Sequence, residues 1–416
     1  MDIKKKNIWI VSYYTAPPPY DTHLRHRKFA HYLEEANYNV TIITGSFIRN
    51  KDSDLIPKDS IYLKKVYDGI KYIHIRTMHY KGNGVKRMLA ILQFAIRLNI
   101  LRNKFQKPDI IIHNAHIPFD NLISRCAKKL KAKYIVEVWD LWPESFVAFG
   151  LIKKDSPLMK IAYKFEKHLY KIADSIIFTM EGGKDYIIEK KWDKDNGGPV
   201  DIKKVFYINN GIDIKDFEKD KIKYQTDDID LNNKELFKVI YLGSIRSANN
   251  VKLLIDAASL LQNYSNIKFL IYGDGSERKK LKTYCSENHI SNVVFKEKWI
   301  PLTNVPYVVS CSSLNMSNYK SNSISKYGGS QGKMFQYMAS GKPICSNQVM
   351  GYDLIIKYNI GIAKKFNSSQ EYADAILSFS TMDKNTYNEI CKRAKIAALD
   401  FDFKILSKKL IKTIEN

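Results

Sequence analysis

Short apolar stretches alternate with helical patterns along almost the whole chain, and this alternation constrains the fold more than any other feature. Strands are predicted at residues 7–12, 40–44, 109–113, 134–138 and 175–179, and helices at 23–33, 122–130 and 157–173. A second series has strands at 238–242, 267–272 and 293–296 and helices at 251–261 and 277–285. Such strand–helix–strand units form parallel sheets covered by helices. The sequence therefore predicts an α/β protein with two doubly wound domains.

The length of the chain supports two domains. Its 416 residues, 45% of them hydrophobic, are enough for two cores and too many for one compact domain. We place the first domain at residues 1–208 and the second at residues 209–397. The segment 215–234 is polar and rich in Asp and Lys, so we expect an exposed loop or linker there.

The chain carries a formal net charge of +24 at pH 7. A charge of this size favours partners that bear phosphate: a nucleotide, an anionic membrane surface or a nucleic acid. A nucleic-acid-binding protein would also need aromatic residues among its basic runs or a recognisable binding module, and the sequence has neither. We therefore expect no nucleic-acid partner.

The cysteines indicate neither a disulfide framework nor a zinc site. Cys126, Cys285, Cys311, Cys345 and Cys391 are scattered and lack the spacing of metal ligands, which fits a reducing cytoplasm. The N-terminal residues are expected to form a strand rather than a signal peptide, and no apolar stretch is long enough to span a bilayer.

A lysine stands at the start of a predicted helix late in the chain. Ser330 and Lys333 precede an amphipathic pattern that ends at Gly341, shortly before Pro343. A helix start offers unpaired N–H groups and the positive end of the helix dipole, and Lys333 adds a full charge on the same side. The segment is either a binding site for a diphosphate or simply a short capped helix.

Polar residues also follow the predicted strand at 238–242. Gly243, Ser244 and Arg246 come directly after it, and Asn250 precedes the next helix. A guanidinium group is a planar fork that binds two phosphate oxygens at once, so Arg246 is a candidate diphosphate ligand. The alternative is a surface arginine near an asparagine that caps the helix.

Two further strand ends carry candidate nucleotide contacts. Gly273 and Gly275 follow the strand at 267–272 and allow close approach of the backbone to a ligand, although this pattern alone is weak. Trp299 and Ile300 follow the strand at 293–296 and form either an apolar shelf for a nucleobase or part of the core.

In the first domain, two side chains beyond strand ends are candidates for contact with a sugar. His116 follows the strand at 109–113, and Asp140 lies in the segment 137–145, which contains two tryptophans and three acids. Aromatic faces pack on sugar C–H groups, and carboxylates accept hydrogen bonds from hydroxyl groups. The alternatives are a structural histidine and carboxylates that cap a helix.

Taken together, these motifs resemble the family-4 retaining glycosyltransferases of GT-B fold, in the branch that builds bacterial O-antigens, lipopolysaccharide, capsules and exopolysaccharides. The resemblance covers nearly the whole chain. It is carried by VWDLWPES at 138–145, NNGID at 209–213, the loop 243–250, YGDG at 272–275 and, most specifically, GKMFQYMASGKP at 332–343.

The resemblance implies two Rossmann-like domains facing across a cleft, with the C-terminal segment 398–416 returning to the first domain. It implies a hexosyltransferase that uses a nucleotide-diphosphate sugar, UDP-linked by expectation, needs no metal or cofactor, and retains the anomeric configuration. Carried over to this chain, the donor-binding residues are Gly243, Ser244, Arg246, Asn250, Gly273, Trp299, Ile300, Ser330, Lys333 and Gln336. Among them, Lys333, Ser244 and Arg246 would lie near the diphosphate and Gln336 near the ribose. His116 and Asp140 would face the transferred sugar.

The chain also departs from the family pattern. Gly328 and Gln336 stand where the family commonly has two glutamates, and Ser244 and Asn250 stand where it commonly has an arginine and a lysine. A non-catalytic sugar-nucleotide binder or assembly subunit of the same fold is therefore the alternative function, and a nucleic-acid-binding protein is a further, less favoured one.

The resemblance further implies a polyprenyl-diphosphate-linked or other glycan acceptor, and hence a peripheral position on the inner face of the bacterial cell membrane. Residues 86–97 form a basic and very apolar helix candidate. This helix either lies in the interface of an anionic membrane or is a core helix with a basic rim.

Overall fold

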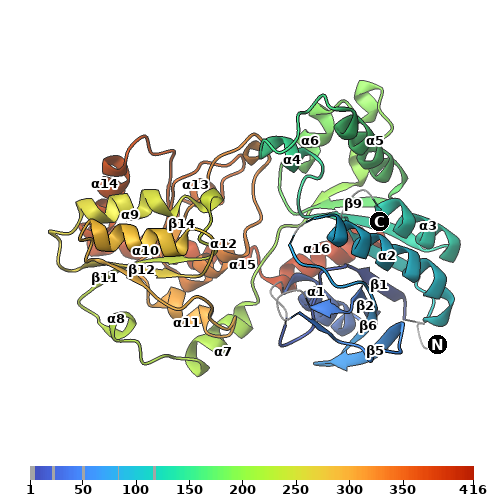
Figure 1. Ribbon diagram of the computed structural model, residues 1–416, viewed down its shortest axis with the longest axis horizontal. Coiled ribbons are helices and arrows are strands. Elements are labelled where there is room, and N and C mark those ends of the chain that lie inside the picture. The colour runs from blue at the N-terminus through green and yellow to red at the C-terminus, as the bar shows by residue number, and fades with distance from the viewer. Residues whose placement is uncertain (1–4, 21–23, 49–51, 83, 116–118) are drawn as a thin grey trace. The chain divides into compact units, whose positions relative to one another are not determined.

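The computed structural model describes residues 5–20, 24–48, 52–82, 84–115 and 119–416. The chain divides into two compact units, one of Met1–Asn209 with Leu406–Asn416 and the other of Asn210–Ile405 (Figure 1). The boundary after Asn209 lies one residue beyond the one we predicted.

The first unit is built on an eight-stranded sheet with the order β10-β9-β8-β7-β1-β2-β6-β5. The strands are β1 (Asn7–Val11), β2 (Asn39–Gly45), β5 (Tyr62–Tyr67), β6 (Ile70–Ile75), β7 (Ile110–Asn114), β8 (Lys133–Val138), β9 (Ser175–Phe178) and β10 (Val205–Tyr207). All neighbouring pairs are parallel except β5 and β6, which form an antiparallel hairpin at the edge. A short antiparallel pair, β3 (Phe47–Ile48) and β4 (Ser53–Asp54), stands apart from this sheet.

Helices cover this sheet. Helix α1 (Arg25–Glu35) packs on β2 and β6, and α2 (Val85–Leu101) contacts α3 (Asp120–Leu130), which in turn contacts α5 (Pro157–Ile172) (Figure 1). The other helices of the unit are α4 (Glu144–Ala148), α6 (Gly183–Glu189) and most of α16 (Phe403–Glu415). Glu415 of α16 pairs with Lys6 at 2.8 Å, so the end of the chain is fastened to its beginning.

The second unit has a six-stranded, all-parallel sheet with the order β13-β12-β11-β14-β15-β16. Its strands are β11 (Phe237–Leu242), β12 (Ile267–Tyr272), β13 (Val293–Phe295), β14 (Leu314–Ser317), β15 (Ile344–Ser346) and β16 (Gly361–Ala363). The chain first adds strands on one side of β11 and then returns to add β14 on the other side. The order therefore reverses between β11 and β14, and ligands of open parallel sheets bind where such a reversal occurs.

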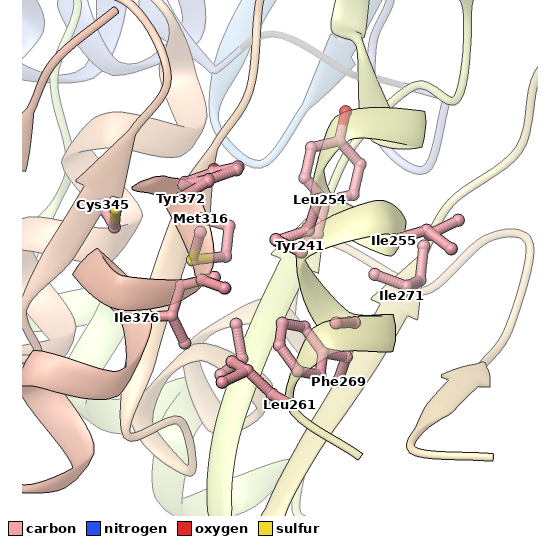
Figure 2. Close-up of a cluster of buried hydrophobic side chains, with 14 of the residues drawn as sticks. Tyr241, Leu254, Ile255, Leu261, Phe269, Ile271, Met316, Cys345, Tyr372 and Ile376 are labelled. Atoms are coloured by element: carbon pink, nitrogen blue, oxygen red, sulfur yellow. The ribbon is translucent and has the colours of Figure 1, made fainter. Parts of the chain in front are cut away.

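The core of the second unit is continuous and apolar. Figure 2 shows Tyr241, Phe269 and Met316 of the sheet packed beneath side chains of two helices, α9 (Val251–Leu260) and α14 (Ser369–Ser380). Further helices of this unit are α10 (Arg278–Glu287), α11 (Val305–Ser310), α12 (Gly332–Ser340), α13 (Leu354–Tyr358) and α15 (Lys384–Leu399).

The α/β architecture with two parallel-sheet domains is confirmed, and two local predictions are wrong. The segment 215–234 is no simple linker, because most of it forms two helices, α7 (Ile214–Lys223) and α8 (Ile229–Asn232), that bury Phe217 and Leu231. Residues 398–405 lie in the second unit rather than the first. They stay there because the Ile212 N–H donates to the Phe401 carbonyl at 3.0 Å and the Phe403 N–H donates to the Ile212 carbonyl at 2.8 Å.

Candidate functional site

Helix α12 is hydrogen-bonded to β11 and β14, the two strands between which the sheet order reverses. The hydroxyl of Tyr337 accepts a hydrogen bond from the Leu242 N–H at the end of β11, at 3.2 Å, and donates to the Met316 carbonyl in β14, at 3.3 Å. Tyr337 is fully buried. The start of α12 is thereby held beside the loops that leave both strands.

Lys333, in the first turn of α12, is a cation without a counter-ion. Its Nζ lies 4.9 Å from the centre of the Tyr241 ring, and a Cβ added to Gly243 would lie 3.9 Å from it. No carboxylate of the described residues pairs with it. Burial lowers the pKa of Lys333 to about 8. A bound anion would remove this cost, because it stabilises the charged form.

The start of α12 also offers backbone N–H groups to an anion, although the Met334 N–H already donates to the Gln331 carbonyl at 3.0 Å. Gln331 caps the helix without a side-chain hydrogen bond, so the N–H groups of the first turn have no side-chain partner there. Ser330 precedes the cap, and its hydroxyl accepts a hydrogen bond from the Asn210 N–H at 3.3 Å. The helix ends at Gly341 in the left-handed conformation, φ +65°, as the sequence predicts.

The glycine loops after β11 and β12 lie backbone against backbone. The Gly243 N–H donates to the Tyr272 carbonyl at 3.1 Å, and a Cβ added to Gly273 would lie 1.8 Å from the Gly243 carbonyl oxygen. A Cβ added to Gly275 would likewise lie 2.3 Å from the Ile245 carbonyl oxygen. The glycines are thus required by the contact between the two loops, whether or not a ligand also approaches them.

Exposed polar residues follow Gly243. Ser244 and Arg246 are solvent-exposed, and within the described ranges Arg246 has no carboxylate partner. The hydroxyl of Tyr241 donates to the Ser244 carbonyl at 2.7 Å and so shapes the turn. Asn250 adopts the left-handed conformation, φ 46°, where α9 begins, without a side-chain cap.

Trp299 and Ile300 have different environments. The side chain of Trp299 is 72% exposed, so the alternative of a core tryptophan is wrong, and its ring is free to stack on a ligand. Ile300 is partly buried and packs against the core beneath.

Two glutamines near the start of α12 have unsatisfied oxygens. The side-chain oxygens of Gln336 and Gln331 are buried without a hydrogen-bond partner. Buried polar atoms are normally paired, so both oxygens are exceptions within this part of the unit. Gln331 was not among the candidates from sequence, because a cap residue gives no distinctive pattern.

The candidates of the first unit are only partly described. Asp140 follows β8 and is exposed, whereas His116 lies outside the described residues. The neighbouring acids are occupied within the protein: the Glu144 carboxylate accepts from Tyr163 at 2.6 Å, and Glu137 is 1% exposed. Asp140 is therefore the acid of this segment that remains available to a sugar.

Glu137 is the centre of a buried network that the sequence did not predict. Its carboxylate binds Arg25 Nε, His26 Nε2 and Trp139 Nε1, each at 2.7 Å. Burial alone raises the pKa of Glu137, but the charges and hydrogen bonds of Arg25 and His26 lower it to about 2. Arg25 also donates to the Ile208 carbonyl at 2.9 Å and to the Asn209 carbonyl. The network joins β8 to the last residues of Met1–Asn209.

The part of the chain that the structure describes has neither a cluster of metal ligands nor a helix that could span a membrane. It contains no group of three or more His, Cys, Asp or Glu side chains able to hold a metal ion. None of its helices is both long and apolar enough to cross a bilayer.

Comparison with known proteins identifies the class of the second unit. Residues 224–397 match the family of glycosyl transferases group 1. This match covers α12 and the loops around Lys333. No curated protein sequence matches the chain.

Solved structures match both units. Sucrose-phosphate synthase from Thermosynechococcus elongatus is 15% identical, with a TM-score of 0.73 over 99% of this chain and 98% of that one. HepE from Anabaena, in complex with UDP and glucose, is 15% identical, with a TM-score of 0.66 over 98% and 99%. α,α-Trehalose 6-phosphate synthase from Burkholderia multivorans is 10% identical, with a TM-score of 0.73 over 99% and 98%.

These comparisons confirm the GT-B fold predicted from the sequence. The match of residues 224–397 to glycosyl transferases group 1 places the chain among the glycosyltransferases. The assignment to the family-4 branch for surface polysaccharides, and the role of each site residue, remain predictions.

Proposed function

We propose that the chain transfers a hexosyl or N-acetylhexosaminyl group from a nucleoside-diphosphate sugar, with UDP as the expected nucleotide, to a lipid-linked saccharide. The observation that carries this proposal is the unpaired, half-buried ammonium group of Lys333 at the start of α12. Similar structures hold donors of the same class: HepE is in complex with UDP-glucose, and a trehalose-6-phosphate protein from E. coli is bound with UDP-2-fluoro glucose.

Catalysis of this transfer depends on stabilising the charge that develops on the leaving group. When the sugar leaves, negative charge accumulates on the diphosphate, so the groups that bind this charge lower the barrier. Lys333, Arg246 and the N–H groups at the start of α12 supply that stabilisation. Gln336 accepts a hydrogen bond from a ribose hydroxyl through its unpaired oxygen.

Retention of configuration, which the family resemblance suggests, requires no nucleophile from the protein. In this proposal the acceptor hydroxyl attacks the face from which the diphosphate departs, and a donor phosphate oxygen takes its proton. Asp140 and His116 bind hydroxyls of the transferred sugar. The acceptor is a polyprenyl-diphosphate-linked or other glycan used in O-antigen, lipopolysaccharide or capsule synthesis, which places the enzyme on the inner face of the bacterial membrane.

A thermal-shift screen with UDP, GDP, TDP, CMP and their sugar conjugates tests the donor site, because a ligand of the native state raises the melting temperature. We expect a selective shift with one nucleoside diphosphate, lost in Lys333→Ala. Lys282→Ala changes an exposed side chain of α10 in the same unit. It is the control and should keep the increase in melting temperature. Equal shifts for both variants would overturn the role of Lys333. Binding without any sugar transfer or donor hydrolysis would instead favour a non-catalytic subunit.

A further inference from the structure

Helix α5 presents an apolar stripe to solvent. Leu158, Ile161, Phe165 and Ile172 are 62%, 52%, 41% and 37% exposed, and their spacing places them on one side of the helix. The opposite side packs within the unit, because Met159, Glu166 and Tyr170 are buried. The turn before α5 adds exposed Phe149 and Leu151. An apolar area of this kind indicates an interaction surface rather than a chance exposure.

A line of lysines runs beside the stripe. Lys160, Lys164, Lys167 and Lys171 recur every three or four residues, which puts them on a third side of α5. The helix has one acidic residue, Glu166, and it is fully buried, where it accepts hydrogen bonds from Tyr170 at 2.9 Å and Tyr186 at 2.8 Å. The exposed surface of α5 therefore carries apolar side chains on one side and lysines on another, with no exposed acidic residue.

The same side of the unit contains a basic groove. It lies between α3 and α5, has a volume of about 710 Å³, and is lined by Arg125, Lys128, Lys164, His168, Phe165 and Ile172, among others. No carboxylate of the described chain pairs with Arg125, Lys128 or Lys164. The one acid in the lining, Asp174, accepts a hydrogen bond from the Tyr134 N–H at 2.7 Å. A phospholipid has a phosphate group next to its acyl chains. The groove has cationic side chains next to apolar ones, so the two are complementary.

We propose that α5 and the groove between α3 and α5 dock the protein on an anionic phospholipid bilayer, with a lipid phosphate in the groove and the apolar stripe in the interface. This inference rests on the proposed function, because a lipid-linked acceptor requires contact with a membrane. It assigns to α5 the role that the sequence suggested for residues 86–97. In α2, Arg87 Nε donates to the Tyr14 hydroxyl and Arg97 donates to the Arg76 carbonyl at 2.6 Å, so both side chains are held against the protein.

Flotation of the full-length protein with phosphatidylcholine vesicles, with and without phosphatidylglycerol, tests this surface. We expect binding only to the anionic vesicles and release at high salt. Lys160→Gln with Lys164→Gln and Lys171→Gln should weaken binding about 100-fold, since each lysine near an anionic surface contributes several-fold. Ile161→Ser with Phe165→Ser should weaken it about tenfold or more. The matched control is Val85→Ser with Ile100→Ser, which changes two α2 residues that are 71% and 69% exposed, and it should bind like the wild type.

The outcomes separate this inference from the proposed function. Each variant should keep its melting temperature and its shift with UDP, which shows that the fold and the donor site are intact. A wild type that binds vesicles but no nucleotide would overturn the proposed function and leave the docking surface standing. The inference is wrong if the wild type does not float with anionic vesicles, or if the α2 control loses binding while the α5 variants retain it. Loss of a dimer, instead of vesicle binding, in the Phe165 variant would assign this face to contact between copies of the chain and also overturn it.

Discussion

The Nζ atom of Lys333 lies 4.9 Å from the centre of the Tyr241 ring and has no carboxylate partner among the residues that the structure describes. Burial lowers its pKa from 10.5 to about 8, so the fold disfavours the charge that ligand binding would use. Below pH 8 this lysine therefore reduces stability, and the penalty disappears as the pH rises toward 10.5.

Replacing this lysine should separate stability from binding. We expect Lys333→Met to melt about 2 °C or more above the wild type at neutral pH without ligand, because the variant no longer buries a charge. The same variant should lose the increase in melting temperature that UDP gives the wild type. Differential scanning fluorimetry of both proteins, with and without UDP, measures both effects. A variant that melts lower than the wild type yet responds fully to UDP would contradict both expectations.

The affinity for UDP should depend on pH through the same group. A diphosphate binds the charged lysine, so affinity should be constant below about pH 8 and fall above it, by up to about tenfold per pH unit. Isothermal titration calorimetry between pH 6.5 and 9.5 spans this transition on both sides of the Lys333 pKa of about 8. The affinity of Lys333→Met should be lower and should not change across this window. A wild-type curve as flat as that of the variant would exclude Lys333 from the site.

We expect the hydroxyl of Tyr337 to contribute more to the free energy of unfolding than an exposed tyrosine hydroxyl does. Tyr337→Phe leaves the partly buried Leu242 N–H without its partner, which costs about 1–3 kcal/mol. It also releases α12 from β11 and β14, so the affinity for UDP should fall as well. Tyr358→Phe is the control, because it removes an exposed hydrogen bond to Asp400. Chemical denaturation and UDP titration should rank the two variants in this order, and equal effects would disprove the role of Tyr337.

The stability that the network around Glu137 provides should be lost in acid. Its pKa of about 2 is below the ordinary value of 4.5, so its contribution is complete above pH 4.5 and is lost as the pH falls toward 2. Glu137→Gln leaves Arg25 buried without a counter-ion and should cost about 3–5 kcal/mol at neutral pH. Glu415→Gln breaks an exposed pair with Lys6 and should cost about 1 kcal/mol or less. Thermal melts between pH 3 and 7 should show a weaker dependence on pH for Glu137→Gln than for the wild type.

Much of the fold was predictable because its signals are local. A strand such as β12 is a continuous apolar run, and α12 ends at a glycine that a left-handed cap requires, so a short window of sequence suffices. The segment 215–234 was misread because its composition is polar, while its folding depends on burying Phe217 and Leu231 against distant residues. A local sequence pattern does not indicate which distant residues will cover these two side chains.

The candidate site was predictable to a similar degree. Lys333 and the loop after Gly243 belong to motifs of fixed spacing, and the structure brings them together at the reversal of strand order. The network of Glu137 was not predicted, although an acid within the buried strand β8 already requires a partner. Its partner Arg25 lies 112 positions away in the chain, and no spacing rule connects the two.

The contact between the glycine loops gives the last prediction. Gly273→Ala places a Cβ 1.8 Å from the Gly243 carbonyl oxygen at φ +125°, so the two loops must separate or the second unit must fail to fold. Gly69→Ala is the matched control, because Gly69 also has a positive φ, +80°, but no atom lies within 4 Å of the added Cβ. The control should cost about 1 kcal/mol, and Gly273→Ala several times more. Melting temperatures and UDP titrations of the two variants decide the matter. If Gly273→Ala binds UDP and melts like Gly69→Ala, the loops tolerate separation and the close backbone contact does not shape the donor site.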